Sequence, residues 1–147
     1  MKEKGFTLFI AIVITATLLL VSTGIISVAV KEAFLTTANR HSQEAFYAAD
    51  SGLECALFWD LKNPSQSAFS LTQTSSITCN QQVFPSVGGP SGQSKFTITF
   101  PPGPNCVEVY VIKRAVQIPK TTIEAYGYNT CNLNDPRRVQ RAIRVKY

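Results

Sequence analysis

Four cysteines are the residues of this chain whose type and spacing most clearly predict chemistry. They are Cys55, Cys79, Cys106 and Cys131, an even number, widely spaced and all placed after the longest apolar run. Such cysteines are typical of disulfide bonds formed in an oxidising compartment. Three pairings are open from sequence. Loop length favours Cys55 with Cys79 and Cys106 with Cys131 as the most local arrangement.

Neither these cysteines nor His41 predicts a metal site. Zinc ligands usually come in closely spaced pairs, but the sequence contains no CxxC pair and His41 is its only histidine. It also lacks the GxSxG and HExxH motifs and a glycine-rich loop between a strand and a helix. We therefore expect no enzyme activity, no catalytic residue, no metal and no cofactor. His41 is expected on the surface of a helix.

Basic residues near the carboxyl end are the candidates for anion contacts. The chain carries 14 lysine and arginine residues against 9 aspartate and glutamate residues, a formal net charge of +5. Arg137, Arg138, Arg144 and Lys146 could together contact phosphates, as DNA binding requires. The alternative is a solvated sheet face, which is favoured because the chain has no long cationic run and few aromatic residues lie among these cations.

An uncharged segment at residues 6–30 decides where the chain resides. As a helix it would reach roughly 37 Å, more than the roughly 30 Å hydrocarbon core of a bilayer. Lys2 and Lys4 precede this segment, and the positive-inside rule then places the amino terminus in the cytoplasm. With the cysteines on the oxidising side, the sequence predicts a single-pass protein of the cytoplasmic (inner) membrane with an exported head.

The helix is predicted to continue from residue 31 to Asn63. No proline interrupts residues 31–62, apolar residues recur at helical intervals, and the pair Asn63-Pro64 supplies a stop. Charged residues lie between the apolar ones, so a single apolar stripe should face the rest of the head. Tyr47, Phe58 and Trp59 are expected to contact that remainder.

The remaining residues predict a connector followed by a sheet. Residues 64–94 are rich in Ser, Thr, Gln, Gly and Pro and predict a surface loop with at most short extended pieces. Alternating apolar and polar residues predict about four antiparallel strands within residues 95–147, at 95–100, 107–113, 121–128 and 139–147. A helix with an apolar stripe and a sheet with an apolar face can cover each other, so we predict an α+β fold with the helix packed on the sheet.

Two motifs resemble the type IV pilin and pseudopilin superfamily. Lys4-Gly5-Phe6-Thr7-Leu8, at the start of the apolar segment, resembles a class III prepilin leader junction. The stretch AFYAADSGLE at residues 45–54 resembles minor pilins of the PilX type. The resemblance covers residues 1 to about 60 and implies a pilin-like head at residues 64–147.

The resemblance implies processing at the amino terminus. Residues 1–5 would form a leader recognised through Lys4 and Gly5, cut by a prepilin peptidase between Gly5 and Phe6. The same enzyme would then methylate the new amino group of Phe6. Residues 6–30 would next leave membrane lipid for the core of a filament, with other pilin subunits and an inner-membrane assembly platform as partners.

One departure from the family refines the role that the resemblance implies. Most major pilins carry a glutamate five residues into the mature chain, where this sequence has Ile10. This favours a minor or priming structural subunit, ending in an extracellular filament or a periplasmic pseudopilus. Three alternatives stay open: a tip minor pseudopilin of a type II secretion system, a DNA-binding competence pilin, and a single-span surface protein unrelated to filaments.

Overall fold

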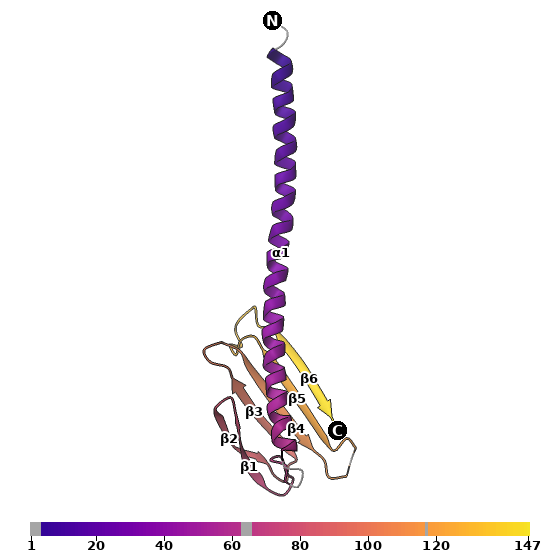
Figure 1. Cartoon of the computed structure of the whole chain (residues 1–147), viewed down its shortest axis with the longest axis vertical. Helices are drawn as coiled ribbons and strands as arrows, with labels where there is room; N and C mark the ends of the chain where they lie inside the picture. The colour runs from indigo at the N-terminus through magenta and orange to yellow at the C-terminus, as the bar shows by residue number, and fades with distance from the viewer. Residues whose placement is uncertain (1–3, 63–65, 117) are drawn as a thin grey trace. The chain divides into compact units, whose positions relative to one another are not determined.

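The computed structural model describes residues 4–62, 66–116 and 118–147, and of Lys4 and Gly5 it describes the backbone alone. The chain divides into two compact units, residues 1–39 and residues 40–147. The described residues form one helix and six strands (Figure 1). Their bounds are α1 Lys4–Leu61, β1 Thr74–Cys79, β2 Gln82–Gly88, β3 Gln93–Thr99, β4 Cys106–Lys113, β5 Thr121–Tyr128 and β6 Gln140–Lys146.

The predicted long helix is confirmed as α1, which has 58 residues. No proline occurs between its ends, so every backbone amide can take part in the helical hydrogen-bond ladder. At the carboxyl end the Lys62 amide still donates to the Phe58 carbonyl at 2.8 Å. The predicted stop at Asn63-Pro64 lies outside the described residues.

The predicted four-stranded antiparallel sheet is also confirmed, with the strand order β3-β4-β5-β6. Val109 of β4 lies opposite Phe96 of β3 on one side and Ala125 of β5 on the other. Ala125 in turn lies opposite Ile143 of β6. This register aligns the inward-facing apolar residues of all four strands, since side chains alternate between the faces with period two.

The prediction of a loop with at most short extended pieces at residues 64–94 is wrong for residues 74–79, 82–88 and 93–94, which lie in strands. β1 and β2 form an antiparallel hairpin there, and β3 already begins at Gln93. Asn80 and Gln81 adopt φ values of 48° and 62°, which suits the two-residue turn of a tight hairpin. Only Ile77, Cys79 and Val87 of the hairpin are buried, so its strands show little apolar alternation in the sequence.

The core of the 40–147 unit lies between α1 and the inner face of the four-stranded sheet, closed at one side by the hairpin. Figure 1 shows the carboxyl-terminal part of α1 crossing the sheet. Alanines of α1 meet larger side chains from the strands, which lets the helix approach closely. The largest fully buried side chains are Phe69, Ile77, Val87, Ile98, Val107, Val109, Val111 and Ile123.

Candidate functional site

The predicted processing junction lies in the first turn of α1, which begins at Lys4. The side chain of Phe6 is 68% exposed. Residues 1–3 of the predicted leader lie outside the described residues. The Gly5–Phe6 bond thus lies in the first described turn of α1.

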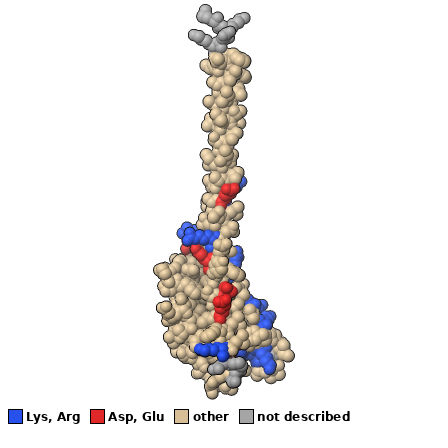
Figure 2. Space-filling model, viewed as in Figure 1, with Lys and Arg blue, Asp and Glu red and all other residues tan. Residues whose placement is uncertain are grey.

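The surface of α1 beyond this junction is apolar and exposed. Its most apolar window has a mean hydropathy of 2.5 and is 0% buried, and the helix is long and apolar enough to cross a membrane by length and composition. The visible face of this part of the helix carries no charged side chain in Figure 2. Ile10, at the position of the family's glutamate, is 40% exposed. A helix with this surface needs lipid or other helices around it.

Four hydroxyl groups within this apolar part donate hydrogen bonds to carbonyls of the helix itself. Thr15 donates to the carbonyl of Ala11 at 3.0 Å, and Ser22 donates to the carbonyl of Leu18 at 2.8 Å. Thr17 and Thr23 make equivalent bonds to carbonyls three residues earlier. Because these hydroxyls need no outside partner, they can enter a hydrocarbon environment at little cost.

The AFYAADSGLE stretch supplies the face of α1 that packs on the sheet. Ala45 and Ala49 are fully buried, and Ala48 and Leu53 are nearly so. These residues follow the helical period and contact the strands through small side chains. The motif that carries the family resemblance is therefore, in this chain, a helix-to-sheet packing motif.

Two glycines make the close approach between α1 and the sheet possible. A Cβ atom on Gly52 would lie 2.8 Å from both methyl groups of Val107. A Cβ atom on Gly127 of β5 would collide with the backbone of Ala45 and Ala49. Gly24, by contrast, has nothing within 4 Å of a Cβ. Of the two helical glycines noted in the sequence, Gly52 is the one required by packing within this chain.

The opposite side of α1 faces solvent, and this corrects the prediction that Tyr47 and Phe58 contact the sheet. Tyr47 is 65% exposed and Phe58 is 54% exposed, so neither is a core contact with the sheet. Phe46 pairs edge-on with Tyr47, the ring centroids lying 5.9 Å apart. Trp59 alone packs against the core, and its indole N–H donates to the Thr78 carbonyl at 3.0 Å. Phe46 and Tyr47 form an exposed aromatic pair on the head.

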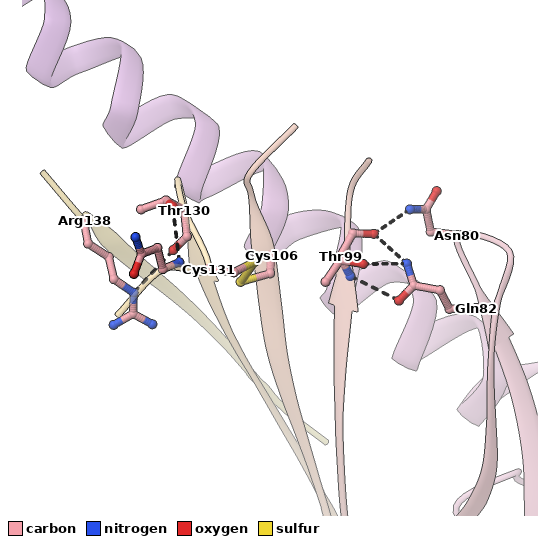
Figure 3. Close-up of a disulfide and its surroundings, with 8 residues drawn as sticks. Asn80, Gln82, Thr99, Cys106, Thr130, Cys131 and Arg138 are labelled. Atoms are coloured by element: carbon pink, nitrogen blue, oxygen red, sulfur yellow. Dashed lines mark hydrogen bonds between the residues drawn. A yellow bond between two sulfur atoms is a disulfide. The ribbon is translucent and has the colours of Figure 1, made fainter. Parts of the chain in front are cut away.

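Two disulfides join the cysteines in the local pairing. Cys55 of α1 is bonded to Cys79 of β1, with Cα atoms 6.0 Å apart. Cys106 at the start of β4 is bonded to Cys131, with Cα atoms 5.6 Å apart (Figure 3). The first disulfide ties the hairpin to the helix. The second ties the segment after β5 to the start of β4. Figure 3 also shows Asn80 and Gln82 bonding to Thr99, which ties the hairpin to the end of β3.

The sequence analysis did not predict that an acidic side chain near the end of α1 is buried. Asp60 is 4% exposed, although it reads as one of the charged residues on the solvent side of the helix. Its carboxylate lies 2.7 Å from Lys113 Nζ and accepts hydrogen bonds from the hydroxyls of Ser67 and Tyr147. Burial, followed by the bond to Asp60, raises the pKa of the Tyr147 hydroxyl. A signal was present in the sequence, because Lys113 continues the buried face Val107, Val109 and Val111 of β4.

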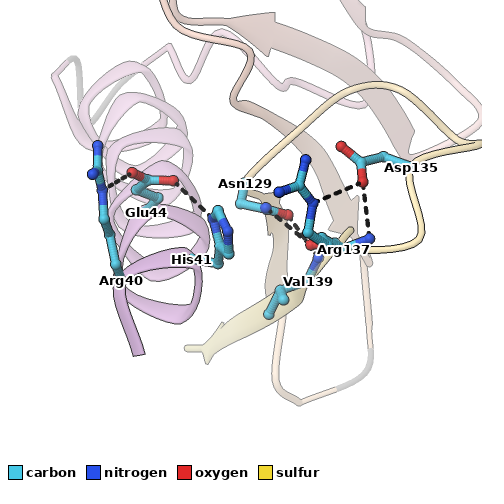
Figure 4. Close-up of polar contacts among 7 residues, drawn as sticks. All are labelled: Arg40, His41, Glu44, Asn129, Asp135, Arg137 and Val139. Carbon is cyan, nitrogen blue, oxygen red and sulfur yellow. Dashed lines mark hydrogen bonds and ion pairs between the residues drawn. The ribbon is translucent and has the colours of Figure 1, made fainter. Parts of the chain in front are cut away.

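His41 is half-buried rather than on the helix surface, which corrects the prediction. Its Nδ1 lies 3.5 Å from Glu44, which also pairs with Arg40 at 3.0 Å (Figure 4). Nearby, the buried amide side chain of Asn129 donates to the Arg137 carbonyl and accepts from the Val139 amide. Asn129, just after β5, is thereby bonded to the backbone just before β6, which holds together the two ends of the segment between these strands (Figure 4).

The four basic candidates do not form one free cationic face. Arg144 lies 2.8 Å from Glu124, and Arg137 lies 3.9 Å from Asp135. The guanidinium of Arg138 stacks on the Tyr128 ring at 3.8 Å. Lys146 is exposed, and no ion pair is recorded for it among the described residues.

Acidic and tyrosine side chains share the outer face of the sheet with these cations. They enclose a shallow hollow of about 270 Å³, lined mainly by Glu108, Tyr110, Glu124 and Tyr126. The hydrogen bond from Lys95 holds the pKa of the Glu108 carboxyl below its usual value. The hydrogen bond to Glu124 raises the pKa of Tyr126. The face is therefore mixed in charge, which gives phosphates little net attraction.

The described residues contain no group of three or more His, Cys, Asp or Glu side chains that could hold a metal ion. What the arrangement offers is surface: an apolar helix for lipid or helical partners and a cross-linked head. This is a pilin-like α+β architecture, a long apolar helix whose carboxyl-terminal part packs on an antiparallel sheet.

Comparison with known families points to the same class of protein. The family model described as PilX N-terminal matches residues 4–54, a segment that contains both the candidate junction and the AFYAADSGLE stretch. This match supports a pilin of the PilX type, and a pilin is a structural protein that associates with other pilus subunits. No curated protein and no solved structure matches the chain.

Proposed function

We propose that this protein is a minor or priming structural subunit of a type IV pilus-like filament. The observation that carries the proposal is the exposed, uncharged surface of α1, where four hydroxyls bond to the helix itself, in a segment that matches the PilX N-terminal family. Such a helix is stable in lipid before assembly and can exchange lipid for neighbouring helices.

Processing between Gly5 and Phe6 is part of the proposal. Residues 1–5 include Lys2, Glu3 and Lys4, whose charges resist transfer into the hydrocarbon core. Removing them would leave a chain that starts at Phe6 and carries no charged side chain before Lys31. Such an end could move out of the bilayer plane into a filament. Methylation of the new amino group would complete the maturation.

Ile10 supports a minor or priming role. A glutamate at this position would need a partner, because an unpaired carboxylate in lipid costs about 2.5–3.5 kcal/mol by insertion scales. The apolar side chain of Ile10 needs no pairing partner, and it cannot pair with the amino terminus of a neighbouring subunit. A subunit of this kind suits a place in the filament where that pairing is not made.

The test of processing is the intact mass of the protein from cells with an active prepilin peptidase. We expect a chain that starts at Phe6 and carries one added methyl group. Gly5→Leu should keep residues 1–5, while Gly24→Ala, a glycine substitution elsewhere in α1, should be processed like wild type. A wild-type chain that retains its first five residues in such cells would contradict the proposal.

The test of assembly is mass spectrometry of sheared filaments. We expect peptides that begin at Phe6 in amounts far below those of the major subunit. Presence in a periplasmic pseudopilus but not in surface filaments would favour the tip pseudopilin of a type II secretion system. Repeated absence from both would favour a single-span surface protein.

DNA binding by a competence pilus remains the other candidate. Lys146, exposed and without a recorded ion pair in the described part of the chain, is the observation that keeps it open. DNA retention by purified filaments should then fall steeply with added salt, since phosphate contacts release counterions. Retention that is equal in wild type and in a Lys146→Gln, Arg144→Gln variant would exclude this surface.

A further inference from the structure

The loop between β4 and β5 exposes two apolar side chains that the proposed function does not use. Val116 is 89% exposed and Ile118 is 90% exposed, more than any other large apolar side chain in the described residues. Both belong to the 40–147 unit, whose remaining large aliphatic residues are mostly buried or half-buried. Two such side chains on one short loop are costly to leave in water and point to a partner.

Positive charge flanks this apolar pair. Arg114 and Lys120 are exposed on either side of it, and no ion pair is recorded for them within residues 4–62, 66–116 and 118–147. Lys113, one residue before the loop, is by contrast held by Asp60. Figure 2 shows positive side chains at the end of the head where α1 ends. The loop therefore presents apolar side chains between two available cations.

A hollow beside the loop extends this surface. It has a volume of about 500 Å³, and its lining residues include Leu71, Ile118 and Tyr147 as well as Arg114 and Lys120. The loop base is fixed, since the Arg114 amide donates to the Lys120 carbonyl at 2.8 Å. Thr121 and Tyr147 exchange backbone hydrogen bonds directly beside it. The apolar side chains thus stand on a braced base rather than at the end of a free segment.

We propose that this loop docks the head on the surface of an anionic phospholipid bilayer. Val116 and Ile118 would enter the boundary between headgroups and acyl chains, while Arg114 and Lys120 contact lipid phosphates. Apolar insertion combined with flanking cations is the chemistry by which proteins bind anionic membrane surfaces. A second copy of this chain fits less well in a symmetric contact, because it would bring the same cations together.

The loop lies at the end of the 40–147 unit where α1 ends, because its neighbour Lys113 contacts Asp60. Any anionic bilayer that this end of the head can reach would provide the contacts.

The experiment uses the full chain held by α1 in nanodiscs of phosphatidylcholine. These are mixed with sedimentable vesicles of phosphatidylcholine alone or with added phosphatidylglycerol, and the bound fraction is measured after centrifugation. We expect binding to the vesicles that contain phosphatidylglycerol, weakened by salt. Val116→Ser with Ile118→Ser should weaken it at least about tenfold, given the apolar area withdrawn from lipid. Arg114→Gln with Lys120→Gln should weaken it about tenfold as well.

Val83→Ser is the matched control, because Val83 is 62% exposed on β2, outside the loop. It should bind like wild type. Thermal unfolding should be unchanged in all variants, since the substituted side chains are exposed. Wild-type binding no greater than that of empty nanodiscs would overturn the proposal. So would equal loss in the Val83 variant, unchanged binding by the loop variants, or clustering of loaded nanodiscs without vesicles, which would indicate a second copy as partner.

Discussion

Lys113 Nζ lies 2.7 Å from the carboxylate of Asp60, joining the end of β4 to the last turn of α1. The Asp60 side chain is 1% exposed and that of Lys113 is 19% exposed. Hydroxyls from Ser67 and Tyr147 complete the hydrogen bonds of the carboxylate. The end of α1 and the segment just after it thus meet two segments that are distant in sequence, at Lys113 and Tyr147, around one buried charge. These contacts fix how the helix ends on the sheet.

Asp60→Asn should lower the free energy of unfolding by about 3 kcal/mol, because it leaves Lys113 without its counter-charge in a largely buried place. Glu54→Gln is the control: it removes the same charge from an exposed position of the same helix and should change stability by less than about 0.5 kcal/mol. Denaturant unfolding of the full chain in detergent micelles measures both. Equal losses of unfolding free energy in the two variants would show that the buried ion pair contributes no more than an exposed charge.

The double variant Asp60→Asn, Lys113→Met should recover much of that loss. Replacing both members of a buried ion pair removes the unpaired charge as well as the attraction. The coupling energy from the double-mutant cycle should therefore be well above the roughly 0.5 kcal/mol expected of independent sites. Additive losses would contradict the contact.

Stability should fall at high pH through Tyr147. The pKa of its hydroxyl is raised in the folded state, so the bond to Asp60 contributes fully below the ordinary tyrosine pKa of about 10. Above that value the unfolded state loses its proton first, and the contribution of the bond is lost as pH rises toward the folded pKa. Tyr147→Phe should be less stable than wild type near neutral pH, with a difference that shrinks above about pH 10. A difference independent of pH would contradict this assignment.

Gly127→Ala should destabilise the head by about 2 kcal/mol or more, because the added methyl meets the helix backbone at Ala45 and Ala49. Gly52→Ala should cost less, since the methyl groups of Val107 can move more easily than a backbone. Gly24→Ala has open space and should cost nothing in the isolated chain. Thermal unfolding midpoints of the three variants give the order. Any other order would argue against close helix-to-sheet packing at β5.

Non-reducing peptide maps should link Cys55 to Cys79 and Cys106 to Cys131. Replacing Cys55 and Cys79 together by serine should lower stability by about 3 kcal/mol, from the loop-closure entropy regained by the unfolded chain. Reduction of the wild type should have at least as large an effect. Any other linkage would mean that the hairpin is attached to the head differently.

Local patterns in the sequence were sufficient for the main elements. The uncharged run from Phe6, the proline-free stretch to Lys62 and the alternation around Val109 and Ile123 each predict an element correctly. Helical and strand periods depend on residues only a few positions apart, so both can be recognised in a single sequence. The hairpin of β1 and β2 was missed because few of its residues are buried, and its pairing depends on α1 and β3 as well as on its own strands.

The sequence alone predicts an apolar helix able to enter lipid, an alternating sheet and a head with enough cysteines for two disulfides. Which side of that helix faces the sheet emerges only from the packing in three dimensions. This orientation of the helix buries Asp60 and leaves Tyr47 and Phe58 in solvent. It also brings the helix backbone so close to β5 that no side chain larger than that of Gly127 fits there. The physical reason is distance along the chain: Asp60 meets Lys113 and Tyr147 across 53 and 87 residues, and no local period encodes such a meeting.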